Sequence, residues 1–422
     1  MTQPQTLAQK LVARACGQAA VRAGEIVTCK VDLAMVHDSS GARRLKPMLE
    51  RLGAKLWDPD RLVVITDHYL PETDDDSRQI LKITRDWVKT EGVRHFYDNV
   101  GICHVVLPEK GHLKPGLFAV GGDSHSPTGG AFGAYMFGIG ATEMLGVVVT
   151  GEIWLRVPET IRLEWSGKLP RGVVAKDMML AMCGQLGMDG GRYQAVEYAG
   201  DAVRGLSMQE RMTLCNMAAE LGAQTGLVAP DATTAAYLRD VGITDVDTAG
   251  WQSDPGATPE ELHHFDASAL APQVAAPHSP ANTAPADSYG NTPINVAYIG
   301  ACTGAKLDDL RMAAAVLKGK KIAANVTLMV GAASLADQQA AEREGVMSAL
   351  VDAGAQLLPN ACGACAGYGA VRFGDGIKVI SSTARNFKGR MGSPLLEVYL
   401  ASPYTVAAAA VAGRIVDPRG ML

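Results

Sequence analysis

The chain has 422 residues and a formal net charge of -5, with 20% charged residues and 47% in the hydrophobic set. This composition is typical of a globular protein of about three domains, and the lack of any run of like charges argues against a nucleic-acid or anionic-membrane partner. The apolar runs are shorter than the ~20 residues that a membrane helix needs, and the first residues lack the apolar core of a signal peptide. We therefore expect a cytoplasmic protein whose eight cysteines are thiols or ligands rather than disulfides.

Strand and helix patterns alternate in residues 1–167, the first predicted domain, and this alternation predicts an open α/β sheet. The predicted elements are a short helix ending at Gly17, a helix at 77–89, and strands at 25–30, 62–66, 104–107 and 117–120. Neither a G-x-G-x-x-G after a strand nor a G-x-x-x-x-G-K-[ST] occurs in the sequence, so nucleotide binding is not supported.

Polar side chains recur where these predicted strands end. They are His37-Asp38, Asp67-His68, His104 and Asp123-Ser124-His125. In open α/β sheets this edge is where binding and catalytic sites are built. A histidine held by an aspartate can act as a general acid, which makes Asp67-His68 and Asp123 with His125 candidates. Any one of these histidines taken alone is more often a hydrogen-bonded structural residue.

Residues 168–265 form the second predicted domain, with helices at 175–186 and 207–221 and a strand at 194–198. Glu197 lies in the apolar stretch AVEYAG, where a carboxylate is costly unless it is paired. It is predicted to be either a paired structural residue or a site residue. Residues 266–291 are rich in Pro, Ala and Ser without apolar periodicity, and are predicted to be a linker.

Residues 292–422 form the third predicted domain, in which strands and helices alternate again. Its predicted elements are strands at 295–299, 325–330, 356–358 and 377–380 and helices at 306–318, 333–344 and 346–353. A last helix begins at Ser402-Pro403, an N-cap residue followed by proline at the first helical position.

Three cysteines stand out in this third domain. Cys302 lies in IGACTG, where a strand leads into a helix N-terminus that favours a thiolate, and Cys362 and Cys365 form a C-x-x-C pair in PNACGACAGYG. Iron–sulfur cubes normally have four cysteine ligands, so three would leave one iron open for catalysis. A Cys₃His structural zinc, a C-x-x-C redox pair and plain buried cysteines fit these residues as well.

Arg385 and Arg390 follow the predicted strand at 377–380 and could face one pocket. Guanidinium groups bind carboxylates bidentately, so two arginines favour a dianionic acid, although ordinary surface ion pairs are an equally simple explanation. An open iron could polarise a C–O bond while a histidine protonates the leaving hydroxyl.

Taken together, the motifs resemble the large subunit of the aconitase superfamily in its two-subunit isopropylmalate dehydratase and homoaconitase branch. The matching motifs span nearly the whole chain: MVHD (35–38), TDHY (66–69), GICHVVLPEKG (101–111), GGDSHS (121–126), AVEYAG (195–200), RMTLCNMAAELGA (211–223), IGACTG (299–304), NACGACAG (360–367) and ARNFKGRMG (384–392).

The resemblance implies three α/β domains packed around a central cluster, and a [4Fe-4S] cluster with one labile iron held by Cys302, Cys362 and Cys365. It implies catalytic roles for Asp67, His68, His104, Asp123, His125 and Glu197, and substrate binding by Ser382, Arg385 and Arg390. In the family a fourth, swivelling domain supplies the serine base. No such domain follows the third one here, so the resemblance implies a separate small subunit and a small di- or tricarboxylate substrate.

Several residues depart from the pattern usual in isopropylmalate dehydratases. The usual Cys-Thr-Asn-Gly-Arg is Cys-Thr-Gly-Ala-Lys from Cys302 to Lys306, the usual Asn before Arg-Asn-Phe is Ala384, and the usual Val-Thr after Asp38 is Ser39-Ser40. A maleate, citraconate or 2,3-dimethylmalate (de)hydratase large subunit therefore fits about as well as a 3-isopropylmalate dehydratase of leucine biosynthesis. A non-catalytic protein with a structural zinc is the alternative from another class.

Overall fold

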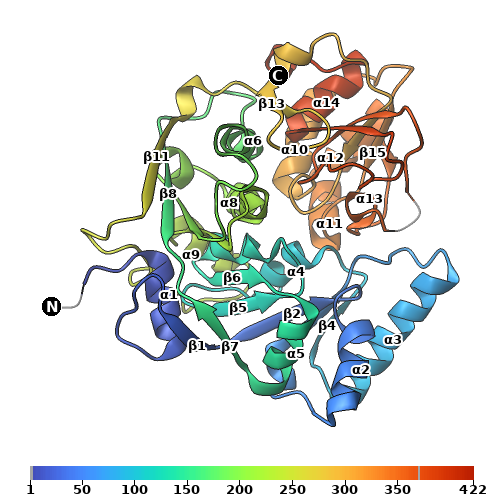
Figure 1. The fold of residues 1–422 in the computed structure, drawn as a ribbon. Helices are drawn as coiled ribbons and strands as arrows, with labels where there is room; N and C mark the ends of the chain where they lie inside the picture. The colour runs from blue at the N-terminus through green and yellow to red at the C-terminus, as the bar shows by residue number, and fades with distance from the viewer. Residues whose placement is uncertain (1–2, 369–370) are drawn as a thin grey trace.

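Three sheets organise the chain in the computed structural model, which describes residues 3–368 and 371–422 (Figure 1). Each sheet is built from one stretch of the sequence, and helices cover it. In Figure 1 the first stretch, in blue to cyan, lies below the third, in orange to red, and the second, in green, lies beside the third. The α/β fold class predicted from the sequence is confirmed.

The first sheet has five parallel strands in the order β4-β3-β2-β5-β6. Strands β2 and β3 are buried along their whole length, which explains why they are nearly continuous apolar runs. The strands are β2 (Leu33–His37), β3 (Leu62–Thr66), β4 (His95–Asp98), β5 (Phe118–Gly121) and β6 (Tyr135–Gly138). The helices are α1 (Leu7–Cys16), α2 (Ala42–Leu52), α3 (Asp75–Glu91), α4 (Cys103–Glu109) and α5 (Ala141–Thr150), and an antiparallel pair, β1 (Ile26–Lys30) with β7 (Glu152–Arg156), lies outside the sheet.

The strand predicted at 104–107 is wrong, because these residues belong to helix α4. The first backbone N–H groups of a helix have no partner within it. Here the carboxylate of Asp67 accepts a hydrogen bond from the backbone N–H of Cys103 at 2.8 Å. A residue far away in the sequence therefore stabilises the start of this helix, and the local apolar pattern does not contain that information.

The second sheet has four parallel strands in the order β10-β9-β8-β11. They are β8 (Thr160–Ser166), β9 (Ala195–Ala199), β10 (Thr225–Val228) and β11 (Glu261–Asp266). The helices are α6 (Ala175–Leu186), α7 (Asp201–Arg204), α8 (Met208–Asn216) and α9 (Ala232–Asp240), and the 3₁₀ turn η3 (Met217–Leu221) follows α8.

The third sheet has seven strands in the order β13-β12-β18-β17-β14-β15-β16. Its parallel strands are β14 (Val296–Ile299), β15 (Thr327–Val330), β16 (Gln356–Leu357), β17 (Lys378–Ser381) and β18 (Glu397–Ala401). Its helices are α10 (Leu307–Leu317), α11 (Leu335–Arg343), α12 (Val346–Ala353), α13 (Gly363–Ala366) and α14 (Pro403–Ala412). Helix α14 begins as predicted, with Ser402 as N-cap and proline at its first position.

The segment predicted to be a linker, 266–291, contributes two strands to this third sheet. They are β12 (Gln273–Ala275), which is buried and pairs antiparallel with β18, and β13 (Thr283–Pro285), which pairs antiparallel with β12. The prediction failed because three-residue strands are too short to show the alternation on which strand prediction rests.

One apolar core runs through all three sheets and includes Met35 in β2, Val196 in β9 and Leu328 in β15. A second core cluster lies around α1 and the first sheet. Within the described residues, no helix combines the length and the apolar character needed to cross a membrane.

Candidate active site

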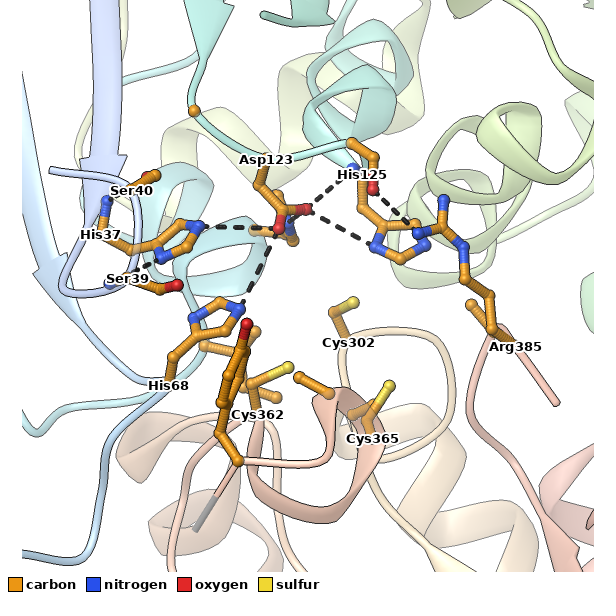
Figure 2. A pocket seen from close by; sticks show the side chains of 18 of the residues that line it. His37, Ser39, Ser40, His68, Asp123, His125, Cys302, Cys362, Cys365 and Arg385 are labelled. Atoms are coloured by element: carbon orange, nitrogen blue, oxygen red, sulfur yellow. Dashed lines mark hydrogen bonds and ion pairs between the residues drawn. The ribbon is translucent and has the colours of Figure 1, made fainter. Parts of the chain in front are cut away.

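The carboxyl ends of strands from the first and third sheets meet at a cavity of about 290 Å³. His37 is the last residue of β2, and His68 and Asp123 closely follow β3 and β5. Cys302 follows β14 on the opposite side. Figure 2 shows Asp123 between His37 and His68 on one side and His125 on the other, with the cysteines gathered below. The strand-end position predicted for the site is thus the position that the fold gives it.

Asp67 and His68 form a tightly hydrogen-bonded pair. His68 Nδ1 lies 2.6 Å from Asp67 Oδ1, and its Nε2 faces the cavity, 4.0 Å from Asp123 Oδ2. Burial opposes ionisation of both groups, but their mutual attraction and hydrogen bond dominate. They lower the pKa of Asp67 to about 2 and raise the pKa of His68 to about 10. His68 therefore holds a proton on the nitrogen that points into the cavity.

Asp38 fixes the backbone that carries this pair. Its buried carboxylate accepts hydrogen bonds from the backbone N–H groups of Asp67 at 3.3 Å, His68 at 3.1 Å and Tyr69 at 2.8 Å. Three successive donors directed at one carboxylate hold the chain in a single conformation as it leaves β3. The acid pair is therefore positioned by a residue at the end of the neighbouring strand.

Asp123 lies at the centre of the histidines. Its Oδ1 accepts hydrogen bonds from the backbone N–H of His125 and from His104 Nε2, both at 2.8 Å, and its Oδ2 lies 3.6 Å from His37 Nε2. Burial opposes ionisation of Asp123, but these histidines hold its pKa well below the usual range. Burial lowers the pKa of His104, so that imidazole stays neutral. The result is a half-buried carboxylate surrounded by histidines.

Arg385 is held by Glu220, a residue that the sequence analysis did not select. Glu220 lies in η3, is fully buried, and accepts hydrogen bonds from Arg385 Nε at 2.5 Å and from His125 Nε2 at 3.1 Å. Burial opposes its ionisation, but Arg385 and His125 lower the pKa of Glu220 to about 2. Arg385 also donates to Ser124 Oγ at 3.0 Å, while Arg390 lines the cavity beside the cysteines.

Cys302, Cys362 and Cys365 line one end of the cavity, and the described residues contribute no fourth cysteine to its lining (Figure 2). A hydrogen bond between the C-x-x-C thiols raises the pKa of Cys362 and lowers that of Cys365, which is also close to Arg390. Burial raises the pKa of Cys302 to about 12, the opposite of the direction expected from a helix N-terminus alone. Three converging sulfurs with one side open toward the histidines fit an iron–sulfur cluster with one exchangeable position.

The loop that carries Cys302 packs directly on Ser382. A Cβ at Gly304 would lie 2.2 Å from the Cβ of Ser382, so only glycine fits there. Ser382 Oγ accepts a hydrogen bond from the backbone N–H of Gly300 at 3.0 Å and lies 3.1 Å from the carbonyl oxygen of Gly304. Ser382 is fully buried and does not line the cavity. Its predicted contact with substrate is therefore not seen, because its hydroxyl is used to hold the cysteine loop.

Glu197 is also not brought to the cavity. Its side chain accepts hydrogen bonds from Ser253 Oγ at 2.6 Å and from Arg162 at 3.3 Å, and it lines a separate cavity on the second sheet. Strand β9 directs Glu197 toward its neighbour on β8, where Arg162 is its register partner. The sequence left open whether Glu197 is a paired structural residue or a site residue. In the structure it is a paired residue outside the candidate active site.

Two buried lysines support the loops that carry the site residues. Lys306 Nζ donates hydrogen bonds to the carbonyl oxygen of Cys302 at 3.0 Å, to Thr213 Oγ1 at 2.9 Å and to Asp309 Oδ2 at 2.7 Å. Lys176 Nζ donates to the carbonyl oxygens of Ser382 at 3.2 Å and of the next residue at 2.5 Å. Both lysines are almost fully buried, behind the cavity wall.

The structure brings together most of the predicted site residues: Asp67, His68, His104, Asp123, His125, Cys302, Cys362, Cys365, Arg385 and Arg390. Sequence analysis missed Glu220, and it named His37 among the strand-end residues without giving it a role in the site. Glu220 had a signal, because it is a carboxylate within the apolar stretch NMAAELGA, which is the same argument that drew attention to Glu197.

Comparisons with known proteins agree with this geometry. The profile of the aconitase family (aconitate hydratase) matches residues 9–293 and 283–413. The 3-isopropylmalate dehydratase large subunit 1 of Methanopyrus kandleri is 44% identical over 99% of both chains. The 3-isopropylmalate dehydratase large subunit of Heliobacterium modesticaldum is 39% identical over 98% of this chain and 99% of its own.

A solved structure shows the same fold at low sequence identity. The crystal structure of Thermococcus kodakaraensis aconitase X (holo-form) superposes with a TM-score of 0.51 at 13% identity, and covers 87% of this chain and 88% of that one. With the profile match over nearly the whole sequence, these similarities establish that the chain belongs to the aconitase family.

Proposed function

We propose that this chain is the large, cluster-bearing subunit of a hydro-lyase that removes or adds water in a small 2-hydroxy di- or tricarboxylic acid. The observation that carries the proposal is that a protonated histidine, three arginines and three cysteines line one cavity. The relatives named 3-isopropylmalate dehydratase large subunits make 3-isopropylmalate the first substrate to test.

Cys302, Cys362 and Cys365 would hold a [4Fe-4S] cluster in which one iron has no cysteine ligand. When bound, this group supplies a Lewis acid for an oxygen of the substrate. Asn216 supports the fit, because its Nδ2 donates a hydrogen bond to Cys302 Sγ at 3.2 Å while the side chain is buried. Such a bond stabilises the thiolate that a cluster requires.

His68 is the proposed general acid. Its Nε2 proton points into the cavity, and Asp67 fixes the tautomer by accepting the bond from Nδ1. Protonation of the departing hydroxyl lets it leave as water, a contribution of about 10²–10⁴-fold for a well-placed acid. Because Asp67 stays ionised, it stabilises the charged form of His68 before the proton is transferred.

The remaining groups would bind and orient. Asp123 would orient the water that is added or the hydroxyl that leaves. Its carboxylate is itself held by hydrogen bonds from His104 Nε2 and from the backbone N–H of His125. Arg385 and Arg390 would bind a substrate carboxylate, with Arg385 held at the required angle by its bond to Glu220.

A separate small subunit is proposed to complete the site. The relatives carry the words large subunit in their names, and this chain spans 99% of their length. Ser39, Ser40 and Ser124 line the described cavity, but none of their hydroxyls donates a hydrogen bond to a side chain among the described residues that could take its proton, and Ser124 Oγ accepts one from Arg385. We propose that the small subunit supplies the proton-abstracting base.

The test is metal analysis followed by turnover. The chain is loaded with iron and sulfide without oxygen, combined with its small subunit, and assayed by the ultraviolet absorbance of the unsaturated acid. We expect about four irons and four sulfides per chain and hydration of a C=C bond. About one zinc without sulfide, and no hydration, would instead support the structural-zinc alternative.

A further inference from the structure

The cavity that holds the candidate catalytic residues adjoins another one. The second cavity has a volume of about 250 Å³ and shares Ser40, Arg44 and Gly122 with the first. Its remaining lining is Ile139, Gly140, Ala141 and Met144, between the end of β6 and the start of α5. A substrate bound in the first cavity could therefore direct a substituent toward the second.

The boundary that the two cavities share includes a glycine. A Cβ at Gly122 would lie 2.6 Å from Ser40 Oγ, so a larger residue would clash with the Ser40 loop. Ser40 is fixed in turn, because its hydroxyl accepts a hydrogen bond from the backbone N–H of His37 at 3.3 Å. The shared boundary is thus formed by close contact between the loops that follow β2 and β5.

Arg44 differs from the other arginines of the cavity. Arg385 is bonded to Glu220 and Ser124, and Arg390 lies beside the cysteines. Arg44, in the first turn of α2, forms no side-chain hydrogen bond or ion pair with any residue in 3–368 or 371–422, and is exposed at the junction of the two cavities. Its guanidinium is therefore available to an incoming anion.

The lining of the second cavity indicates what kind of group carries that anion. Ile139, Ala141 and Met144 suit one or two methylene groups, whereas Arg44 and Ser40 suit an oxygen anion at their end. Glu143, in the first turn of α5, uses its carboxylate to accept a hydrogen bond from the backbone N–H of Gly140 at 2.9 Å. A purely alkyl substituent would leave the arginine without a partner.

We propose that Arg44 is a specificity-determining residue that binds an additional carboxylate on the variable substituent of the substrate. The preferred substrates are then hydroxy tricarboxylic acids rather than alkyl-substituted malates. This inference rests on the hydro-lyase function proposed above.

The experiment uses the cluster-loaded complex with the small subunit and two isosteric substrates, 3-(carboxymethyl)malate and 3-isobutylmalate. These differ only in whether the substituent ends in a carboxylate or in two methyl groups. We expect Arg44→Met to lower kcat/KM for the tricarboxylate about ten- to hundredfold, mainly through KM, and to leave the alkyl substrate unchanged. Arg44→Lys should recover part of this loss.

Arg43→Met is the matched control, since Arg43 is on the same helical turn but donates a hydrogen bond to Tyr69 Oη at 3.2 Å and does not line the cavity. It should leave the ratio of the two kcat/KM values unchanged. As a measurement independent of turnover, calorimetric binding of the unreactive propane-1,2,3-tricarboxylate should weaken about ten- to hundredfold in Arg44→Met only.

Three outcomes separate the possible failures. A wild-type complex that turns over 3-isobutylmalate but not the tricarboxylate, or an Arg44→Met variant with an unchanged ratio, would overturn this inference and leave the hydro-lyase function standing. An unchanged ratio together with weaker binding of the small subunit would assign Arg44 to the subunit interface instead. A loaded complex that hydrates no unsaturated acid of either kind would overturn the proposed function itself.

Discussion

The negative charge of Asp67 keeps His68 protonated, although the imidazole is buried. Because the pKa of His68 is raised to about 10, its imidazolium form persists across the neutral range, and Asp67 remains ionised beside it. A neutral side chain of similar size could keep the hydrogen bond to Asp67 without carrying the acidic proton. The role of this residue can therefore be separated from the integrity of the site.

Substitution of His68 by Asn tests this role. We expect kcat to fall about 10²–10⁴-fold with iron and sulfide contents unchanged, because His68 donates a proton and does not bind the metal. Steady-state kinetics on the loaded complex measures the first quantity and chemical analysis the second. His95→Asn, which lies outside the cavity beside His112, is the control. A decrease of less than tenfold would show that another group is the acid.

Cys365→Ser tests the ligand set. We expect the variant to lose the visible absorption and the iron of the reconstituted chain, because a serine hydroxyl does not replace a thiolate ligand at neutral pH. Cys215→Ser is the control, since Cys215 is equally buried but packs in the core away from the cavity. Equal iron content in both variants would mean that Cys365 is not a ligand.

At the scale of single residues, the sequence showed what kinds of side chain form the site better than it showed which individual residues reach it. The strand-end rule located Asp67, His68 and Asp123 because the carboxyl ends of neighbouring parallel strands share one edge. Sequence analysis selected Glu197 and missed Glu220, although both are carboxylates in apolar stretches. Only the contact of η3 with the Arg385 loop, between residues distant in sequence, distinguishes them.

At the scale of elements, the start of α10 is supported by a single buried cation, Lys306. Lys306 precedes this helix and joins it to α8 through Thr213, while its ammonium also bonds to Asp309 and to the Cys302 carbonyl. Loss of the ammonium would leave the carboxylate of Asp309 buried without a cation. Isopropylmalate dehydratases usually have an arginine where this chain has Lys306. Because Lys306 lies behind the cavity wall, this difference affects how the Cys302 loop is supported and not the lining of the cavity.

Lys306→Met should lower the free energy of unfolding by about 3–5 kcal/mol, the usual result of removing one partner of a buried ion pair. Urea unfolding followed by circular dichroism measures the change. Lys318→Met, at the exposed end of the same helix, should change stability by no more than about 0.5 kcal/mol. An equal effect of the two substitutions would contradict the assignment of a structural role to Lys306.

The contact between α4 and α11 should make stability depend on pH. Burial raises the pKa of Glu109, whose carboxyl meets Ser334 Oγ at 2.5 Å, to about 8, and burial raises that of Asp337 to about 6. Below pH ~4.5 folded and unfolded chains both bind the Glu109 proton. From there to about pH 8 only the folded chain keeps it, so this contribution to stability is lost as pH rises.

We therefore expect Glu109→Gln to reduce the loss of stability between pH 5 and 8.5 by about 2 kcal/mol, compared with wild type. The urea midpoint at several pH values measures this. Asp337 titrates in the same direction and will leave part of the slope in the variant. Glu50→Gln, on the exposed face of α2, is the control, and equal slopes in all three proteins would contradict the prediction.

Long elements with clear patterns were predicted closely, and short or tertiary-dependent ones were not. The strand at 62–66 and the helices at 175–186 and 346–353 are confirmed with the same bounds, because apolar periodicity and glycine ends define them. Strands β12 and β13 depend instead on the pairing of β12 with β18. The helical state of residues 104–107 depends on the hydrogen bond from Cys103 to Asp67. A local sequence pattern does not show contacts between residues that are distant in the sequence.

For the whole molecule, the catalytic cavity is open on the side that the small subunit is proposed to cover. We predict that the isolated, cluster-loaded chain turns over at least about 10²-fold more slowly than the complex, which is the low end of a general base contribution. Addition of the purified small subunit should restore the rate, with half-maximal activity at the dissociation constant of the complex. Full turnover by the isolated chain would contradict the two-subunit proposal.

The strand order of the third sheet also has a consequence for synthesis on the ribosome. Its central strands, β17 and β18, come last in the chain, whereas the strands on both sides of them emerge first. The nascent chain therefore carries two separate half-sheets with open edges, which are templates for aggregation until the last strands join them. Since Cys302 is presented by one of those halves, we expect iron and sulfide delivery to follow translation, and cells that overproduce the chain to need chaperones before they need iron.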